Sequence, residues 1–169
     1  MVLDLLALGE EDRVLSDVRR QIGHALQVPA DEQELERIGY EVKDGDIALV
    51  RTDASDQFES AGYQNKHAGL RRSATEWLVR RGVRLIGIDA WGLDRPFDVM
   101  SKELEAGDEA QFWESHFFGR EMPYCQIEKL VNLRDLPVAH GFCVAAFPIK
   151  LHRSSGAWAR VVAFVPEPR

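Results

Sequence analysis

The sequence predicts an α/β fold in which helices flank a β-sheet core, and three observations lead to this expectation. The chain has 169 residues, enough for one domain. Hydrophobic residues make up 45% of it and charged residues 29%, the composition of a globular protein with a sizeable core. Residues 47–88 contain a predicted strand, helix and strand, an order that favours parallel pairing through a crossover. We therefore expect a single domain over residues 1–169.

The first half of the chain alternates predicted strands and helices. Apolar runs predict the strands, and apolar positions at helical spacing predict the helices. Asp31-Glu-Gln-Glu34 matches a capping box, and Ser73 is the expected N-cap of a later helix. Residues 53–69, rich in Ser, Asp, Gln and Gly, are expected to form a loop. The predicted strands are 2–6, 47–51 and 83–88, and the predicted helices are 11–25, 31–38 and 73–81.

The second half is predicted to hold two helices, at 99–105 and 108–118, followed by three strands. The first of these strands, 124–131, alternates so that Gln126 and Glu128 share one face. The last two strands are 142–149 and 161–165. The two cysteines, Cys125 and Cys143, lie in apolar runs and are expected to be buried as small hydrophobic residues. Two cysteines without a C-x-x-C spacing fit a reducing, cytoplasmic location.

Charge and hydropathy exclude several classes of partner. The chain has 21 basic and 28 acidic residues, a net charge of −7, whereas a nucleic-acid-binding surface is basic. The longest apolar stretch is residues 142–149, far short of the roughly 20 residues that span a membrane. No basic amphipathic helix is predicted. We therefore expect neither a nucleic acid nor a membrane as partner.

Common catalytic motifs are absent from the sequence. It contains no G-x-G-x-x-G, no Walker A sequence and no G-x-S-x-G. The histidines are at positions 24, 67, 116, 140 and 152, so no two are four residues apart and no H-E-x-x-H occurs. Motifs of this kind indicate nothing beyond an α/β domain.

Three longer blocks resemble a known family. Asp46-Ile-Ala-Leu-Val-Arg-Thr52 resembles a GDIVLLRT strand, and Gly82-Val-Arg-Leu-Ile-Gly-Ile-Asp89 resembles a GVRLIGID strand. Between them, Trp77-Leu-Val-Arg-Arg-Gly82 resembles the WLVERG that ends a helix. The third block runs from His116 to Glu128 and continues as Lys-Leu-Val-Asn-Leu133, which resembles an H…LL…G…E-N-L segment with the same spacing of 12. The chain thus resembles the cyclase family of kynurenine-formamidase-like and isatin-hydrolase-like metal-dependent hydrolases.

This resemblance extends to the end of the chain, where Gly141–Lys150 and Gly156–Ala163 are similar to the closing hairpin of the family. It implies a swivelling-type mixed β-sheet flanked by helices, assembled as a dimer or tetramer. It also implies hydrolysis of a small non-peptide amide, formamide, cyclic amide or lactone with zinc or manganese. His116 and Glu128 match the metal-facing His and Glu, so the resemblance makes both metal ligands and gives Glu128 a catalytic role.

One part of the family pattern has no match here. The diagnostic H-x-G-T-H-x-D-x-P motif lies upstream of the block that begins at Met1, and it carries most of the metal ligands. We therefore expect a chain that lacks its N-terminal portion, has a misplaced start or has lost catalysis, with weak metal binding or none. A catalytically inactive subunit that needs a partner segment, and a polyketide cyclase, are the alternative functions.

Further candidate residues follow from their position on the predicted fold. Trp91 and Asp94 follow the carboxyl end of the predicted strand 83–88, where α/β proteins usually bind ligands. His67 lies in the loop expected to cover that edge. All three are expected to contact substrate. The alternatives remain open: Asp94 can cap a helix or stabilise a turn, Trp91 can be part of the core, and His116 can be a core histidine on an aromatic face.

Overall fold

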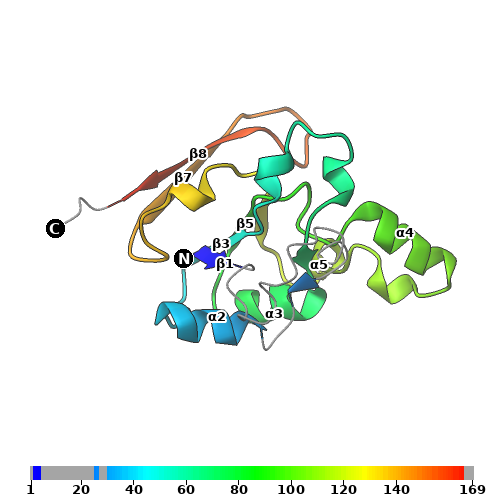
Figure 1. Ribbon diagram of the computed structural model, residues 1–169, viewed down its shortest axis with the longest axis horizontal. Coiled ribbons are helices and arrows are strands. Elements are labelled where there is room, and N and C mark those ends of the chain that lie inside the picture. The colour runs from blue at the N-terminus through cyan, green and yellow to red at the C-terminus, as the bar shows by residue number, and fades with distance from the viewer. Residues whose placement is uncertain (1, 5–24, 27–29, 166–169) are drawn as a thin grey trace.

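The computed structural model describes residues 2–4, 25–26 and 30–165, and at its centre lies a four-stranded parallel sheet (Figure 1). The strand order is β1 (Val2–Asp4), β3 (Ile47–Arg51), β5 (Leu85–Ile88) and β6 (Cys125–Ile127). All neighbouring strands in this sheet are parallel, so their carboxyl ends meet at one edge. This is the edge at which α/β proteins usually bind ligands.

Helices and two small sheets surround the central sheet. The described helices are α2 (Ala30–Ile38), α3 (Arg72–Arg80), α4 (Phe97–Glu105) and α5 (Glu114–Phe118). Short 3-10 helices are η3 (Ala54–Gln57), η4 (Tyr63–Asn65), η5 (Glu109–Gln111) and η6 (Leu133–Asp135). The small sheets are the parallel pair β2 (Ala25–Leu26) and β4 (Gly69–Leu70), and the antiparallel hairpin β7 (Cys143–Pro148) and β8 (Ala159–Phe164).

The two faces of the sheet are covered differently because side chains alternate along each strand. In β3, Ala48 and Val50 face α2 and α3 and belong to the larger hydrophobic core. Leu49 points to the other face and packs with residues of the β7–β8 hairpin. A strand buried on both faces is apolar at successive positions, and this explains the run Ile-Ala-Leu-Val in β3.

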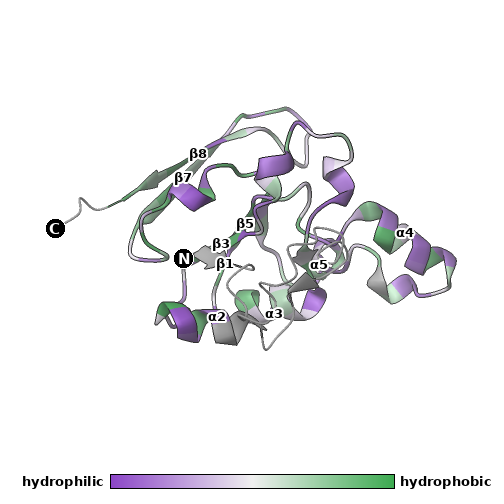
Figure 2. Ribbon diagram, viewed as in Figure 1, coloured by the Kyte–Doolittle hydropathy of each residue, from purple (hydrophilic) through white to green (hydrophobic). Residues whose placement is uncertain are grey.

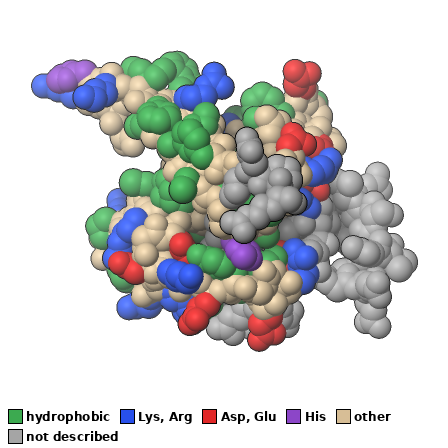
Figure 3. Space-filling model, turned by 90° about the vertical axis from the view of Figure 1, so that its left-hand side faces the viewer, with side chains coloured by type: hydrophobic (Ala, Val, Ile, Leu, Met, Phe, Trp, Pro, Cys, Tyr) green, Lys and Arg blue, Asp and Glu red, His purple; other side chains and the backbone are tan. Residues whose placement is uncertain are grey.

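The β7–β8 hairpin carries apolar residues on its outer face as well. Phe147, Ile149, Trp158 and Phe164 are between 53% and 78% exposed. Figure 2 shows the hydrophobic colour along both strands, and in Figure 3 the upper part of the molecule, where the hairpin lies, projects from the body. Between the hairpin and the sheet runs a groove of about 1050 Å³ with apolar walls that include Leu130, Val144 and Val161.

The structure confirms the α/β fold class, a sheet flanked by helices. The expected strand 47–51 is confirmed to the residue, and the helix expected at 31–38 is present as α2. The helix expected at 11–25 lies almost wholly outside the described residues. No helix within the described part of the chain is both long and apolar enough to cross a membrane.

Two expectations for α2 and β6 are wrong. Asp31 is not the N-cap of α2, because the helix begins at Ala30 and Glu34 pairs with Arg37. The strand expected at 124–131 covers only Cys125–Ile127.

Three further local expectations are wrong. Ser73 is not the N-cap of α3, because Arg71 holds that position and the carboxylate of Glu114 accepts the Arg72 N–H. The helix expected at 108–118 is divided into η5 and α5 by Trp113, whose φ of 47° is incompatible with a right-handed helix. Cys125 and Cys143 are exposed, since one lies on the edge strand β6 and the other on the hairpin.

Gly69 allows the chain to pass close to the loop that follows β5. The Leu70 N–H donates to the Leu93 carbonyl over 2.7 Å, so β4 runs directly against this loop. A Cβ at position 69 would lie 2.2 Å from the carbonyl oxygen of Asp94 and 2.6 Å from the Arg95 nitrogen. Only glycine fits at that separation.

Replacing Gly69 by alanine is therefore expected to destabilise the protein by about 1–3 kcal/mol, the usual cost of forcing an extra methyl group into a packed region. Urea unfolding followed by circular dichroism measures this. Gly156→Ala is the matched control, because no heavy atom lies within 4 Å of the place that its Cβ would occupy. Equal stability of the two variants would contradict the close approach at Gly69.

Candidate metal and substrate site

The residues expected to bind metal and substrate converge on one cavity at the carboxyl edge of the sheet. The cavity has a volume of about 480 Å³. All five candidates line it: His67, Trp91, Asp94, His116 and Glu128. They come from separate elements, because Trp91 and Asp94 follow β5, Glu128 follows β6, His116 lies on α5 and His67 follows η4.

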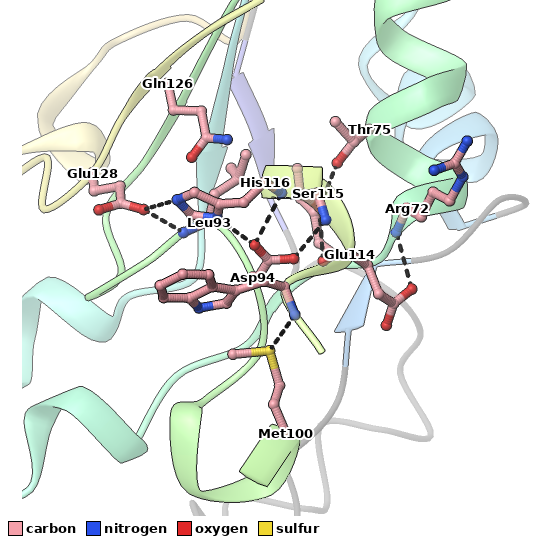
Figure 4. Close-up of polar contacts among 12 residues, drawn as sticks. Arg72, Thr75, Leu93, Asp94, Met100, Glu114, Ser115, His116, Gln126 and Glu128 are labelled. Carbon is pink, nitrogen blue, oxygen red and sulfur yellow. Dashed lines mark hydrogen bonds and ion pairs between the residues drawn. The ribbon is translucent and has the colours of Figure 1, made fainter. Parts of the chain in front are cut away.

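His116 is held by Asp94 (Figure 4). Its Nδ1–H donates to Asp94 Oδ2 over 2.5 Å, and the same carboxylate accepts the backbone N–H groups of Ser115 at 2.7 Å and His116 at 3.3 Å. The Asp94 side chain is only 4% exposed. The hydrogen bond that His116 donates to Asp94 raises the pKa of His116 above its ordinary value, with burial acting in the opposite direction. In the neutral ring, the Nδ1–H leaves the lone pair on Nε2.

That Nε2 faces Glu128. His116 Nε2 and Glu128 Oε1 are 3.8 Å apart, and Oε1 also accepts the Leu93 N–H over 3.0 Å. Two ligands about 2.1 Å from a tetrahedral zinc ion would be separated by roughly 3.4 Å. The imidazole and carboxylate therefore fit two positions around one ion. Among the described residues, no group of three or more His, Cys, Asp or Glu could hold a metal.

The position of α5 depends on a buried ionic network behind His116. Glu114, at the start of α5, lies 3.1 Å from an Arg71 nitrogen and 3.4 Å from an Arg95 nitrogen, and its carboxylate also accepts the Arg72 N–H. Arg95 is itself 2% exposed and forms a bidentate pair with Glu103 of α4. The first turn of α5 is thus fixed to α3 and α4 before any ligand binds.

Trp113 adds an aromatic contact to His116. The two rings are stacked, with centroids 5.4 Å apart and an interplanar angle of 27°. The left-handed backbone of Trp113 is rare for a bulky residue, and such strain is often found at functional sites. Its N–H is directed to the sulfur of Met100 at 3.4 Å. His116 is therefore confined from one side by Asp94 and from another by Trp113.

Trp91 and His67 form further walls of the cavity. Trp91 is 45% exposed, and its ring meets Tyr63 edge-on at 5.9 Å. His67 is 4% exposed and donates its Nδ1–H to the Ala68 carbonyl over 2.9 Å. Burial lowers the pKa of His67 below its ordinary value, which favours the neutral ring.

Several residues that the sequence did not single out also line the cavity, namely Gln64, Asn65, Arg95, Phe97, Asp98, Met100 and Trp113. Trp113 lies within the predicted helix 108–118 and Phe97 just before the predicted helix 99–105, where aromatic residues usually indicate packing. The sequence offered one signal for these residues, the aromatic pair Phe112 and Trp113 close to His116, but such a pair also fits an ordinary hydrophobic face. Phe97 joins this cluster only in the structure.

Comparison with known proteins gives one family match. A family described as "Putative cyclase" matches residues 11–95, half of the chain. None of the curated protein sequences matches this chain.

Solved structures with a similar fold include three hydrolases. An isatin hydrolase bound to the product analogue thioisatinate has a TM-score of 0.71 and 23% identity, covering 98% of this chain and 59% of its own. Isatin hydrolase A from Ralstonia solanacearum has a TM-score of 0.71 and 24% identity, with coverages of 86% and 55%. A "potential metal-dependent hydrolase with cyclase activity" has a TM-score of 0.63 and 21% identity, with coverages of 99% and 64%. This chain thus spans less than two thirds of each, and the similarity establishes the fold.

The Asp94–His116 hydrogen bond predicts a pH dependence of stability in metal-free protein. Because the pKa of His116 is raised in the folded state, the bond stabilises the protein fully below the unfolded value of about 6.5, and the contribution is lost as pH rises through the folded pKa. Asp94→Asn is expected to remove this component. The melting temperature of the unmodified protein should therefore fall more between about pH 6 and about pH 9 than that of Asp94→Asn.

The double variant with His116→Asn is the control. In that background the effect of Asp94→Asn should no longer depend on pH, because the titrating ring is absent. A pH-dependent effect that persists without the imidazole would mean that Asp94 acts through another group.

Proposed function

The chain belongs to the cyclase family, and on that basis we propose that it contributes the carboxylate and imidazole of the metal site in a metal-dependent hydrolase of a small amide, formamide, cyclic amide or lactone. The observation that carries the proposal is the pairing of His116 Nε2 with Glu128 Oε1 at 3.8 Å on the wall of a 480 Å³ cavity. Imidazole and carboxylate are ligands that suit Zn²⁺ and Mn²⁺.

Each residue has a distinct task in this proposal. His116 and Glu128 would hold the ion, which when bound supplies Lewis acidity towards a carbonyl oxygen. Asp94 keeps the proton of His116 on Nδ1 and so directs the Nε2 lone pair to the site. Both Asp94 oxygens are occupied by donors from α5, so we assign Asp94 to positioning His116 rather than to substrate contact.

Trp91 and His67 are proposed as substrate contacts. The exposed part of Trp91 offers an apolar surface for a flat group, and the cavity is large enough for a small molecule. His67 is neutral by virtue of its burial and is therefore suited to hydrogen bonding rather than to charge pairing. Neither role requires residues outside the described cavity.

A second candidate is a subunit that hydrolyses nothing until other donors join it. It is motivated by the size of the proposed ligand set, since His116 and Glu128 are two groups whereas a zinc site usually has three or four protein ligands. Both candidates agree that His116 and Glu128 bind the ion. They differ in whether this chain alone supplies enough ligands for a catalytic ion.

Glu128→Gln and His116→Ala are each expected to weaken binding of Zn²⁺ by about tenfold or more, because each removes one of the two donors. Calorimetric titration of Zn²⁺ and Mn²⁺ into the protein, alone and mixed with a segment bearing an H-x-G-T-H-x-D-x-P motif, measures the effect. Hydrolysis of simple formamides, lactones and cyclic amides is assayed in the same samples.

His152→Ala is the matched control, because His152 is exposed between the strands of the hairpin. Metal affinity and hydrolysis that fall together in the two site variants, with His152→Ala unchanged, support the hydrolase. Affinity that is indifferent to Glu128→Gln would remove this carboxylate from the metal site. Hydrolysis by the protein alone would favour the first candidate, whereas hydrolysis that appears only in the mixture would favour the subunit that needs further donors.

A further inference from the structure

Lys129, the residue after Glu128, has an unusual backbone. Its φ is 59°, in the left-handed region that asparagine and glycine adopt more readily than lysine. It lies two residues after the end of β6. A strained residue beside a candidate site suggests that its side chain has a task there.

The contacts of Lys129 converge on the loop after β5. Its backbone N–H donates to the Ala90 carbonyl over 2.9 Å, and its Nζ donates to the Trp91 carbonyl over 2.7 Å. The ammonium also lies 4.3 Å from the centroid of the Trp91 ring, a cation–π contact. Lys129 thus binds the carbonyls of Ala90 and Trp91 and contacts one face of the Trp91 ring.

Trp91 is confined from a second direction. Tyr63 meets its ring edge-on, with centroids 5.9 Å apart and an interplanar angle of 79°. Tyr63 is 3% exposed, and its hydroxyl donates to the Asp89 carbonyl over 3.2 Å, so this partner is itself fixed. The remaining surface of Trp91 borders the cavity that contains His116 and Glu128.

The ammonium of Lys129 also affects the charge at the cavity wall. Its Nζ lies 3.8 Å from Glu128 Oε2, whereas His116 is paired with the other oxygen, Oε1. A cation against one face of an indole withdraws electron density from the other face, so the free face attracts a second cation less strongly. A wall built in this way favours neutral ligands over cationic ones.

We propose that Lys129 is a specificity-determining residue, which fixes the Trp91 indole as a rigid wall of the cavity and makes that wall select neutral flat compounds over cationic ones. The fixing of Trp91 is inferred from its contacts and does not depend on the proposed function. The consequence for substrate choice rests on the proposed function.

The fixing of Trp91 is tested by acrylamide quenching of tryptophan fluorescence, with the Trp91 contribution obtained by subtracting the signal of Trp91→Phe. Lys129→Met is expected to raise the quenching constant of Trp91 about twofold, because the ring loses its cation and its anchored carbonyl. Lys129→Arg keeps a cation and hydrogen-bond donors and should restore the original value. Lys129→Gly relieves the left-handed backbone, so its melting temperature should not fall, yet its quenching should match Lys129→Met.

Quenching that is unchanged in Lys129→Met would overturn the proposal. So would an equal change in a Trp91→Phe background, since the change would then come from another tryptophan. Normal quenching in Lys129→Gly would show that the side chain has no part in holding the indole.

Selectivity is tested by equilibrium binding of two matched probes, formanilide and its para-trimethylammonio derivative. The unmodified protein should bind the neutral probe more tightly, and Lys129→Met should narrow the ratio of dissociation constants about fivefold. A ratio unaffected by Lys129→Met, or no binding of either probe, would overturn the specificity role. Hydrolysis of formanilide is followed separately, so its absence would count against the proposed function and leave the quenching and binding results to decide the role of Lys129.

Discussion

The carboxylate of Asp94 connects the end of β5 to the start of α5 and accepts three N–H groups there. A buried carboxylate without such partners would carry a large desolvation cost, and with them it becomes a rigid anchor. The position of His116, the orientation of its ring and the identity of its protonated nitrogen all follow from this one group. Gly69 also contributes to this arrangement, because its lack of a side chain lets β4 lie against the backbone of Asp94. The geometry of the site therefore depends on groups that position His116.

The sequence predicted which candidate residues lie together better than it predicted the elements that carry them. The bounds of the strand 47–51 were predicted to the residue because burial on both faces makes its apolar run unambiguous. Trp91, Asp94 and Glu128 share a cavity because parallel strands end at one edge, a rule that needs only the strand order, whereas His116 and His67 reach it from α5 and from the chain after η4. The pairing of His116 with Glu128 came from a spacing of 12 shared with a family. Whether these residues bind metal or substrate stays a prediction.

The sequence could not reveal features that depend on contacts between distant residues. The helix expected at 108–118 is broken at Trp113, whose backbone is stabilised by contacts with Met100 and His116 that no local propensity reports. Asp94 was expected near substrate because its position on the sheet edge was visible, whereas its partners 21 and 22 residues later were not. Cys125 was expected inside because apolar neighbours in sequence do not distinguish an edge strand from a central one.

The unequal covering of the two sheet faces has a consequence for how the molecule opens. On the helix side, the described core contains fifteen buried residues from α2, α3, α5, the strands and their loops, whereas three buried residues hold the hairpin side. Local unfolding follows the smaller contact area, so among the described elements we expect β7 and β8 to exchange their amide protons with solvent before the central sheet does. The sheet, α5 and the Asp94–His116 pair can keep their structure through such an opening. Each excursion of the hairpin would briefly widen the groove that Glu128 lines, so the weakly held part of the fold borders the candidate site.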